Sequence, residues 1–358
     1  MKSFSFNNSF IAGLIAAALL SCAACGGGGA NSGAAGGSSR PDGVLTIYTY
    51  RALPGQDSVF QRFEQRSGLK LEVVEMPPFE LAARLRKEGA ESPADIVIFP
   101  EVSMAIRARQ EGLLQSYKLP GIDQYFKDVL GDEQGYWTGL TRIVPAIAYS
   151  HERLNPANLK TWVDLAMPRF QGKVLAPSSE DPYLQSIVAS FILHNGDQAA
   201  RAWATAMVRN FAREPQGNTM DQLRGLAAGV GDVAITTASD LGYLRYPLTY
   251  NEYLIGEGAR LIIPKNGQFN THINVTCATV PKGGEVRKAV AFLEYMTSRE
   301  AQMDYPRVAQ EHPVNVMAIP SDYIIEEVGP VEEDDLELNL LGQYNQQARQ
   351  ILKEVGWK

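Results

Sequence analysis

NFAREPQGNTMDQLRGLAAGVGDVAITTASDLGY, residues 210–243, is the stretch whose pattern decides the fold. Apolar residues recur at helical spacing between residues 219 and 227, after a side chain at Asn218 or Thr219 that can cap a helix. The run 232–237 is short, apolar in its middle and bounded by turn residues, which predicts a strand covered on both faces. A helix, a buried strand and a second helix in this order indicate an α/β sheet.

The end of this strand is a candidate ligand site. Thr237, Ser239 and Asp240 place two hydroxyls and a carboxylate where the next helix would begin. Open α/β sheets bind their ligands at the carboxyl ends of such strands. The same side chains are also common helix caps, so Ser239 or Asp240 has a structural interpretation of equal weight.

Strands and helices alternate over the rest of the chain as well. Strands are expected at 44–50, 71–75 and 95–100, with amphipathic helices at 58–66 and 79–89 between them. This alternation predicts parallel pairing with right-handed crossovers. The later segments predict long extended stretches at 137–149 and 271–280, a strand at 173–176, and helices at 182–194, 199–212, 284–296, 298–305 and 338–357.

The composition limits the function classes. The chain has 358 residues, 45% of them hydrophobic, which is enough for two domains of ordinary size. Its net charge of −7 and its lack of basic runs argue against a nucleic-acid partner. The sequence contains no GxSxG, HExxH or nucleotide-binding glycine motif, so nothing in it indicates an enzyme. Cys277 is the one cysteine outside the N-terminal region, and we expect it to be buried on a strand.

The first 43 residues predict export and a tether, outside the fold. The apolar run Ile11–Leu20 is too short to cross a bilayer, which needs roughly 20 apolar residues. We therefore interpret residues 1–21 as a signal peptide. Residues 22–43, rich in Gly and Ser, predict a flexible linker.

The sequence Leu-Leu-Ser-Cys that ends at Cys22 resembles the lipobox of bacterial lipoproteins, in which the cysteine carries the lipid. We therefore expect lipidation at Cys22 and an exported, periplasmic protein anchored to a membrane. Cys25 is a weaker candidate for the lipid. Cleavage of an ordinary secretory peptide near Ala24 is the alternative.

Several segments together resemble one protein family, the ferric-iron substrate-binding proteins of bacterial ABC transporters. The matching segments are Pro215–Asn218, Asp221–Arg224, Ala83–Leu85, Glu88–Ala90 and Ser92–Asp95. Further similarity extends over nearly the whole mature chain, from Leu45 to Trp357.

The resemblance implies a type II periplasmic-binding-protein fold, in which two α/β lobes are joined by crossover strands that act as a hinge. The expected lobes are residues 44–142 plus 273–310, and residues 143–272 plus 311–358. It further implies a monomeric solute-binding component of an ABC importer, which closes around a small ligand and meets a permease and an ATPase. No resident cofactor is implied, and ferric iron would be the transported ligand.

The family's iron site departs from this sequence at most positions. The family uses two adjacent tyrosinates, often with a histidine, an acidic residue and a bound anion, because ferric iron is a hard cation. Ser239 and Asp240 stand at the tyrosine pair, Ala52 at the histidine and Pro78 near the acidic position. Tyr183 matches a family tyrosine that can reach the site.

Replacement ligands come from several expected elements. The ligand-binding candidates are Tyr50, Arg51, Glu101, Arg142, Tyr183, Ser239, Asp240 and Tyr243, and the metal candidates are Tyr183, Asp240 and Glu80. Each also has a structural interpretation, such as a helix cap, a solvated helix face or a core aromatic. The two arginines favour an alternative ligand, a small organic anion or phosphonate. A second alternative is a periplasmic partner that reports a ligand to a membrane receptor.

Overall fold

A computed structural model describes residues 43–53, 55–120, 122, 125–126, 130–246, 250–266 and 268–358. These residues belong to one compact unit, Ser39–Lys358. The expected signal peptide, the lipidated Cys22 and most of the expected linker lie outside the described residues. None of the described helices is long and apolar enough to cross a membrane.

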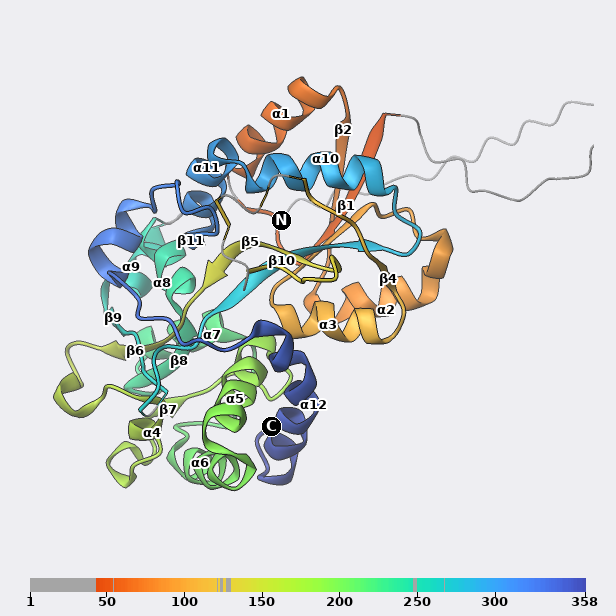
Figure 1. Cartoon of the computed structure of the whole chain (residues 1–358). Helices are drawn as coiled ribbons and strands as arrows, with labels where there is room; N and C mark the ends of the chain where they lie inside the picture. The colour runs from red at the N-terminus through yellow and green to blue at the C-terminus, as the bar shows by residue number, and fades with distance from the viewer. Residues whose placement is uncertain are drawn as a thin grey trace, which may run out of the picture. The chain divides into compact units, whose positions relative to one another are not determined.

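The first sheet contains seven strands in the order β11-β5-β10-β3-β1-β2, with β4 paired to β10 (Figure 1). Its strands are β1 (Val44–Thr49), β2 (Lys70–Glu75), β3 (Ile96–Phe99), β4 (Leu114–Gln115), β5 (Thr138–Ile143), β10 (Asn274–Pro281) and β11 (His312–Pro313). β1 pairs in parallel with β2 and β3, as the alternating pattern predicted. β10 runs antiparallel to both β3 and β5, so a late segment of the chain completes the middle of this sheet.

Helices cover both faces of the first sheet (Figure 1). They are α1 (Gln56–Ser67), α2 (Pro78–Glu88) with the 3-10 turn Gly89–Glu91, α3 (Val102–Gln110), α10 (Val286–Thr297) and α11 (Arg299–Ala309). Phe60 and Phe63 on α1 contact Phe292 on α10, with ring centroids 5.8 and 5.2 Å apart. Burying an aromatic side chain of this size stabilises the fold by about 1.5–3 kcal/mol, which explains the apolar stripe predicted for α1.

The second sheet contains four strands in the order β7-β8-β6-β9. Its strands are β6 (Pro145–Ser150), β7 (Val174–Leu175), β8 (Val233–Thr237) and β9 (Ala259–Ile262). Its helices are α4 (Trp162–Leu165), α5 (Pro182–Asn195), α6 (Asp197–Asn210), α7 (Thr219–Ala227), α8 (Ala238–Arg245) and α9 (Tyr250–Glu257), with 3-10 turns at Pro156–Asn158 and Pro168–Phe170.

The stretch 210–243 folds as its pattern predicted. The Asn218 side chain accepts from the Asp221 N–H at 3.1 Å, and the Asp221 carboxylate accepts from the Asn218 N–H at 3.1 Å. This capping box starts α7, because it satisfies N–H groups that have no partner inside the helix. Every residue of β8 is buried, and α8 follows at once.

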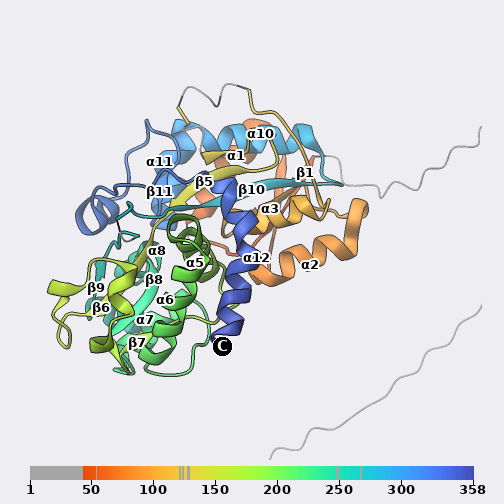
Figure 2. The ribbon, with the colours of Figure 1, turned by 60° about the horizontal axis from the view of Figure 1, so that its bottom comes forward.

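The last helix, α12 (Leu338–Glu354), follows a π-helical turn at Ile324–Val328. It packs against α5 and α6 beside the second sheet, as expected, and also against α3 beside the first (Figure 2). Gly342 permits this second contact, since a Cβ there would lie 2.3 Å from the Ile106 Cγ2.

Cys277 lies in β10 and is fully buried, which confirms its expected place on a covered strand. Burial raises the pKa of its thiol well above the usual value, so the thiol stays protonated and unreactive.

Candidate functional site

Four side chains form the candidate site, which we call the tyrosine–arginine cluster: Tyr50, Arg51, Tyr183 and Tyr243. Tyr50 and Arg51 directly follow β1, whereas Tyr183 lies in the first turn of α5 and Tyr243 in α8. The Arg51 guanidinium carbon lies 4.8 Å from the centre of the Tyr50 ring. Arg51 also interacts electrostatically with Tyr183 and Tyr243. The cluster therefore joins elements of both sheets.

Arg51 is held by a partly buried ion pair that the sequence did not suggest. Its Nη2 donates to Glu311 Oε1 at 2.7 Å, and Glu311 is only 2% exposed. The other carboxylate oxygen of Glu311 accepts from the Thr141 hydroxyl in β5. Glu311 follows Gln310, the one non-glycine residue with a positive φ (50°) in the described part of the chain. This left-handed turn ends α11 and places Glu311 within reach of Arg51.

Gly242 lets α8 approach the same turn closely. An added Cβ at this position would lie 2.6 Å from the Gln310 Cβ and 2.7 Å from the Tyr323 ring. Backbone atoms of α8 therefore pack where a side chain would clash. The next residue along the helix is Tyr243, so this close approach brings Tyr243 toward Arg51.

The charges of the cluster follow from burial. Burial raises the pKa of the phenols of Tyr50, Tyr183 and Tyr243, and the charge of Arg51 only partly offsets this. Burial alone would lower the pKa of Arg51, but Glu311 and the nearby phenols outweigh it, and the pKa rises. At neutral pH the cluster therefore contains neutral phenols and a guanidinium cation paired with one carboxylate.

Two hydrogen-bond donors of the cluster have no partner among the described residues: Arg51 Nε and the Tyr243 hydroxyl, both of which are buried. The Tyr50 hydroxyl, in contrast, bonds to Thr276 Oγ1 at 3.2 Å. A buried donor without an acceptor costs about 1–3 kcal/mol. A water, an ion or a ligand can supply such a missing partner.

Ser239 and Asp240 both take part in the first turn of α8. Asp240 Oδ2 accepts from the Thr237 N–H at 3.2 Å, and the Thr237 hydroxyl accepts from the Asp240 N–H at 3.2 Å. The same carboxylate oxygen accepts from the hydroxyls of Thr236 and Thr237. Ser239 is 6% exposed and bonds to the Thr237 hydroxyl. A capping box accounts for these contacts, and a ligand role for either residue stays a prediction.

Glu101 is a fully buried N-cap of α3. Its carboxylate accepts from the N–H groups of Ser103 and Met104 at 2.8 and 3.0 Å and from Asn274 Nδ2 at 3.2 Å. Burial raises its pKa, and these hydrogen bonds oppose the rise. Both carboxylate oxygens are therefore bonded within the fold.

Arg142 and Glu80 have no hydrogen bond or ion pair to the cluster among the described residues. Arg142 donates to the Pro313 carbonyl at 3.0 Å and forms an ion pair with Glu333. Glu80 is exposed in the first turn of α2. Their proposed ligand roles stay predictions, but the structure groups neither with the four residues of the cluster.

Asp181 is a buried acid at the start of α5. It caps α5 two residues before Tyr183, accepting from the Leu184 N–H at 2.9 Å. Burial raises its pKa to about 7, backbone hydrogen bonds oppose the rise, and the charge of Asp240 adds to it. Asp181 therefore fixes the start of the helix that carries Tyr183.

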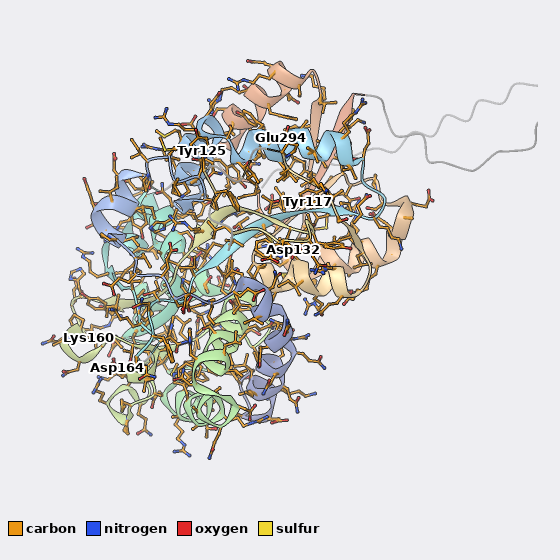
Figure 3. The ribbon with its side chains drawn as sticks, in the orientation of Figure 1. Tyr117, Tyr125, Asp132, Lys160, Asp164 and Glu294 are labelled. Carbon is orange, nitrogen blue, oxygen red and sulfur yellow. The ribbon has the colours of Figure 1, made fainter. Side chains whose placement is uncertain are left out.

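Two cavities lie outside the tyrosine–arginine cluster. One of about 770 Å³ is lined by Arg142, His312, Glu333, Asp334 and apolar side chains such as Ile324. The other, of about 450 Å³, is lined by Tyr117, Asp132 and their neighbours, near β4 and β5 of the first sheet. Figure 3 shows Tyr117 and Asp132 far from Lys160 and Asp164. No cluster residue lines either cavity. We place the candidate site at the cluster because its residues come from elements beside both sheets.

In the described part of the chain, no three His, Cys, Asp or Glu side chains come together in a way that could hold a metal ion. A metal at the cluster would therefore depend on phenols. His272 is fully buried and bonds to Ser186 Oγ at 2.9 Å.

The fold and the cluster define a binding protein with two α/β lobes. Comparison with known proteins identifies its family. Residues 56–303 match the family of bacterial extracellular solute-binding proteins. The chain belongs to this family, which consists of transport proteins and not enzymes.

Its relatives include iron-binding members. Iron uptake protein A2 of Synechocystis sp. is 33% identical over 326 residues, covering 90% of this chain and 92% of that protein. The structure of a Trichodesmium protein in complex with iron and citrate ligands has a TM-score of 0.81 and 28% identity, covering 88% of this chain and 100% of that one. A ferric binding protein from Campylobacter jejuni has a TM-score of 0.83 and 28% identity over 88% of this chain and 100% of that one. These findings confirm the resemblance and the type II periplasmic-binding-protein fold.

Proposed function

We propose that this protein is the extracytoplasmic solute-binding component of an ABC importer, and that it captures a small ligand at the tyrosine–arginine cluster. The proposal rests on which elements contribute the residues of the cluster. Tyr50 and Arg51 come from the first sheet, whereas Tyr183 and Tyr243 come from helices beside the second. A ligand that contacts both groups stabilises the closed arrangement of the lobes.

The partners follow from this mechanism. A permease that contacts both lobes distinguishes the closed form from the open form, and an ATPase drives release of the ligand into the membrane channel. The names of the relatives, which include an iron uptake protein, support import over other uses of the fold. A ligand-sensing role beside a membrane receptor predicts no uptake defect when the gene is deleted.

The names of the relatives suggest ferric iron as the ligand. The cluster, however, lacks most of the ligands that the family uses in its iron site. Hard ferric iron selects charged oxygen ligands such as tyrosinate. Ser239 and Asp240 stand where the family has its adjacent tyrosine pair, and Asp240 is bonded within a capping box. We therefore expect weak or absent visible absorption on adding ferric citrate, because tyrosinate-to-iron charge transfer needs ligated phenolates.

The test is native mass spectrometry with elemental analysis of protein purified from its own host, beside uptake measured in a strain that lacks the protein. A bound small molecule or ion together with lost uptake of that species supports the proposal. Protein that carries no ligand, in a strain with normal uptake of iron and of small anions, contradicts it. A strong visible band that disappears in Tyr183→Phe would instead establish a ferric site.

We also propose that the N-terminus anchors the protein to a membrane. Lipidation at Cys22 would hold the protein at a membrane, with residues 22–43 as a linker. Cys22→Ala is expected to move the protein into the soluble periplasmic fraction. Continued membrane fractionation with Cys25 intact would assign the lipid to Cys25.

A further inference from the structure

The larger cavity, of about 770 Å³, lies at the edge of the first sheet and is separate from the tyrosine–arginine cluster. Arg142 in β5 and His312 in β11 are paired in antiparallel register, and both line this cavity. Side chains directly opposite each other in such a pair lie on the same face of the sheet. The rest of the wall comes from Ile273 and from the segment 320–336. A cavity of this volume is large enough for a small organic molecule.

His312 is a buried polar side chain without a partner. Its exposed fraction is only 8%, and no described residue forms a hydrogen bond with its ring nitrogens. Burial, with a smaller contribution from Arg142, lowers the pKa of His312 to about 3, so the ring is neutral at pH 7. A neutral imidazole has one nitrogen that accepts a hydrogen bond. A molecule in the cavity that donates a hydrogen bond would therefore satisfy this ring.

The charge of the cavity wall is negative. The segment 322–337 contains eight acidic residues and no Lys, Arg or His. Three of the acids, Glu333, Asp334 and Asp335, line the cavity, against one basic residue, Arg142. Such an excess of carboxylates attracts a cation and repels an anion.

The three acids differ in how they are paired. Glu333 forms an ion pair with Arg142, which offsets the positive charge of the arginine. Asp334 bonds to His194 Nε2 at 3.0 Å. Asp335 is exposed and has no hydrogen bond or ion pair among the described residues. Asp335 is therefore the carboxylate that remains for a cation.

The shape and the lining of the cavity favour an organic cation over a metal ion. In the described part of the chain, no three His, Cys, Asp or Glu side chains converge as a metal site requires. Much of the wall is apolar, with Ile273, Ile324, Val331 and Leu336 among its residues. Apolar walls with a few polar groups are typical of sites for organic molecules.

We propose that the larger cavity binds a small organic cation, a primary amine with an apolar chain. Its ammonium group donates to the His312 ring and is attracted by Asp335, and its chain packs against apolar side chains such as Ile324 and Val331. This site is distinct from the tyrosine–arginine cluster and does not depend on the ligand bound there.

The experiment is calorimetric titration of the full chain at pH 7 with butylamine and phenethylamine, beside the neutral 1-butanol and the anion butyrate. We expect at least one amine to bind. Butylamine should bind at least tenfold more tightly than 1-butanol or butyrate, because the three have similar apolar chains and differ in charge. Amine affinity should also fall as the salt concentration rises.

Two residues of the wall provide the variants. His312→Leu removes both ring nitrogens and keeps an apolar side chain, and it should weaken amine binding at least fivefold. His312→Gln keeps an acceptor and should retain more of the affinity. Asp335→Asn should weaken amine binding threefold to tenfold and leave the melting temperature unchanged, because Asp335 is exposed.

Two matched variants serve as controls. Asp322 is an exposed acid of the same segment that does not line the cavity. Tyr183 belongs to the tyrosine–arginine cluster. Asp322→Asn and Tyr183→Phe should both leave amine affinity unchanged. Hydrogen exchange of the wild-type protein should in addition show protection of residues 320–336 by the amine, a result that needs no variant to fold.

Three results would each overturn the inference: neither amine binds, butyrate binds as tightly as butylamine, or Tyr183→Phe weakens the amine while Asp335→Asn does not. The last result would place the amine at the cluster. None of the three affects the proposed importer function, which rests on the cluster, and an importer that fails its own test leaves the amine site standing.

Discussion

The tyrosine–arginine cluster and a polar chain of five residues bury similar groups in different ways. The polar chain is defined as Glu101, Asn274, Ser186, His272 and Asp334. Asn274 Nδ2 donates to Glu101 at 3.2 Å and to Ser186 at 2.6 Å, and Ser186 bonds to His272 at 2.9 Å. This polar chain links the start of α3, beside the first sheet, to α5, beside the second.

The difference lies in how completely the groups are paired. Within the polar chain, His272 Nδ1 alone lacks a hydrogen bond, and it faces the Asp334 carboxylate at 3.8 Å. In the cluster, Arg51 Nε and the Tyr243 hydroxyl remain unpaired. Buried polar groups that are paired within the protein stabilise the fold, whereas an unpaired buried donor leaves room for a partner from outside, such as a water, an ion or a ligand. Mutations should therefore affect stability in the first region and ligand affinity in the second.

The largest expected effect is on stability, from Glu101→Ala. This change removes the acceptor for two backbone N–H groups of α3 and for Asn274, all in a fully buried place. We expect the free energy of unfolding to fall by about 3 kcal/mol, because buried donors lose their partner. Urea unfolding measures this loss, and citrate titration of the folded variant should show affinity within twofold of the wild type. A tenfold loss of affinity with normal stability would make Glu101 a ligand contact and remove the contrast.

His312 provides a pH-dependent test beside the larger cavity, which Arg142 and Glu333 also line. Burial, with a smaller contribution from Arg142, lowers the pKa of His312 from 6.5 to about 3. The unfolded chain therefore takes up a proton first as the pH falls. The stability that neutral His312 provides is complete above pH 6.5 and is lost as the pH falls from there toward 3.

The corresponding variant is His312→Gln, which should flatten the acid side of the stability curve. The wild type should lose about 2 kcal/mol more than the variant between pH 7 and pH 5. Urea unfolding at several pH values measures this difference. Parallel curves for the two proteins would show that His312 does not titrate below its usual pKa in the folded state.

Much of the fold follows from local patterns in the sequence. The periodicity in 210–243 predicted α7, β8 and α8, and the alternation of strands and helices predicted the parallel core of the first sheet. The short strands β4 and β11 and the helix α9 were not predicted. β4 and β11 contain only two residues each, and they are strands only because β10 and β5 lie beside them.

The site was less predictable, because its key contact joins distant residues. Tyr50, Arg51, Tyr183 and Tyr243 were among the candidates, but Glu311 was not, since it lies 260 residues from Arg51 and carries no local motif. Glu101 and Asp240 were candidates as well, because each lies where a strand ends and a helix begins. A strand end followed by a helix favours both a cap and a ligand contact, and only the three-dimensional hydrogen bonds distinguish them.

Asp240 gives the smallest and most discriminating test. Asp240→Ala should cost about 1 kcal/mol of stability, because Thr237 loses its partner in the capping box. Asp240→Asn keeps one acceptor oxygen and should cost less. Burial raises the pKa of the Tyr243 phenol most, Glu311 and Tyr305 add to this, and Asp240 adds a smaller contribution. Removing the negative charge of Asp240 should therefore strengthen binding of an anionic ligand at the cluster slightly, by less than threefold. Melting curves and citrate titration of both variants measure these effects, and a tenfold loss of affinity in Asp240→Asn would show instead that this carboxylate binds a cationic part of the ligand.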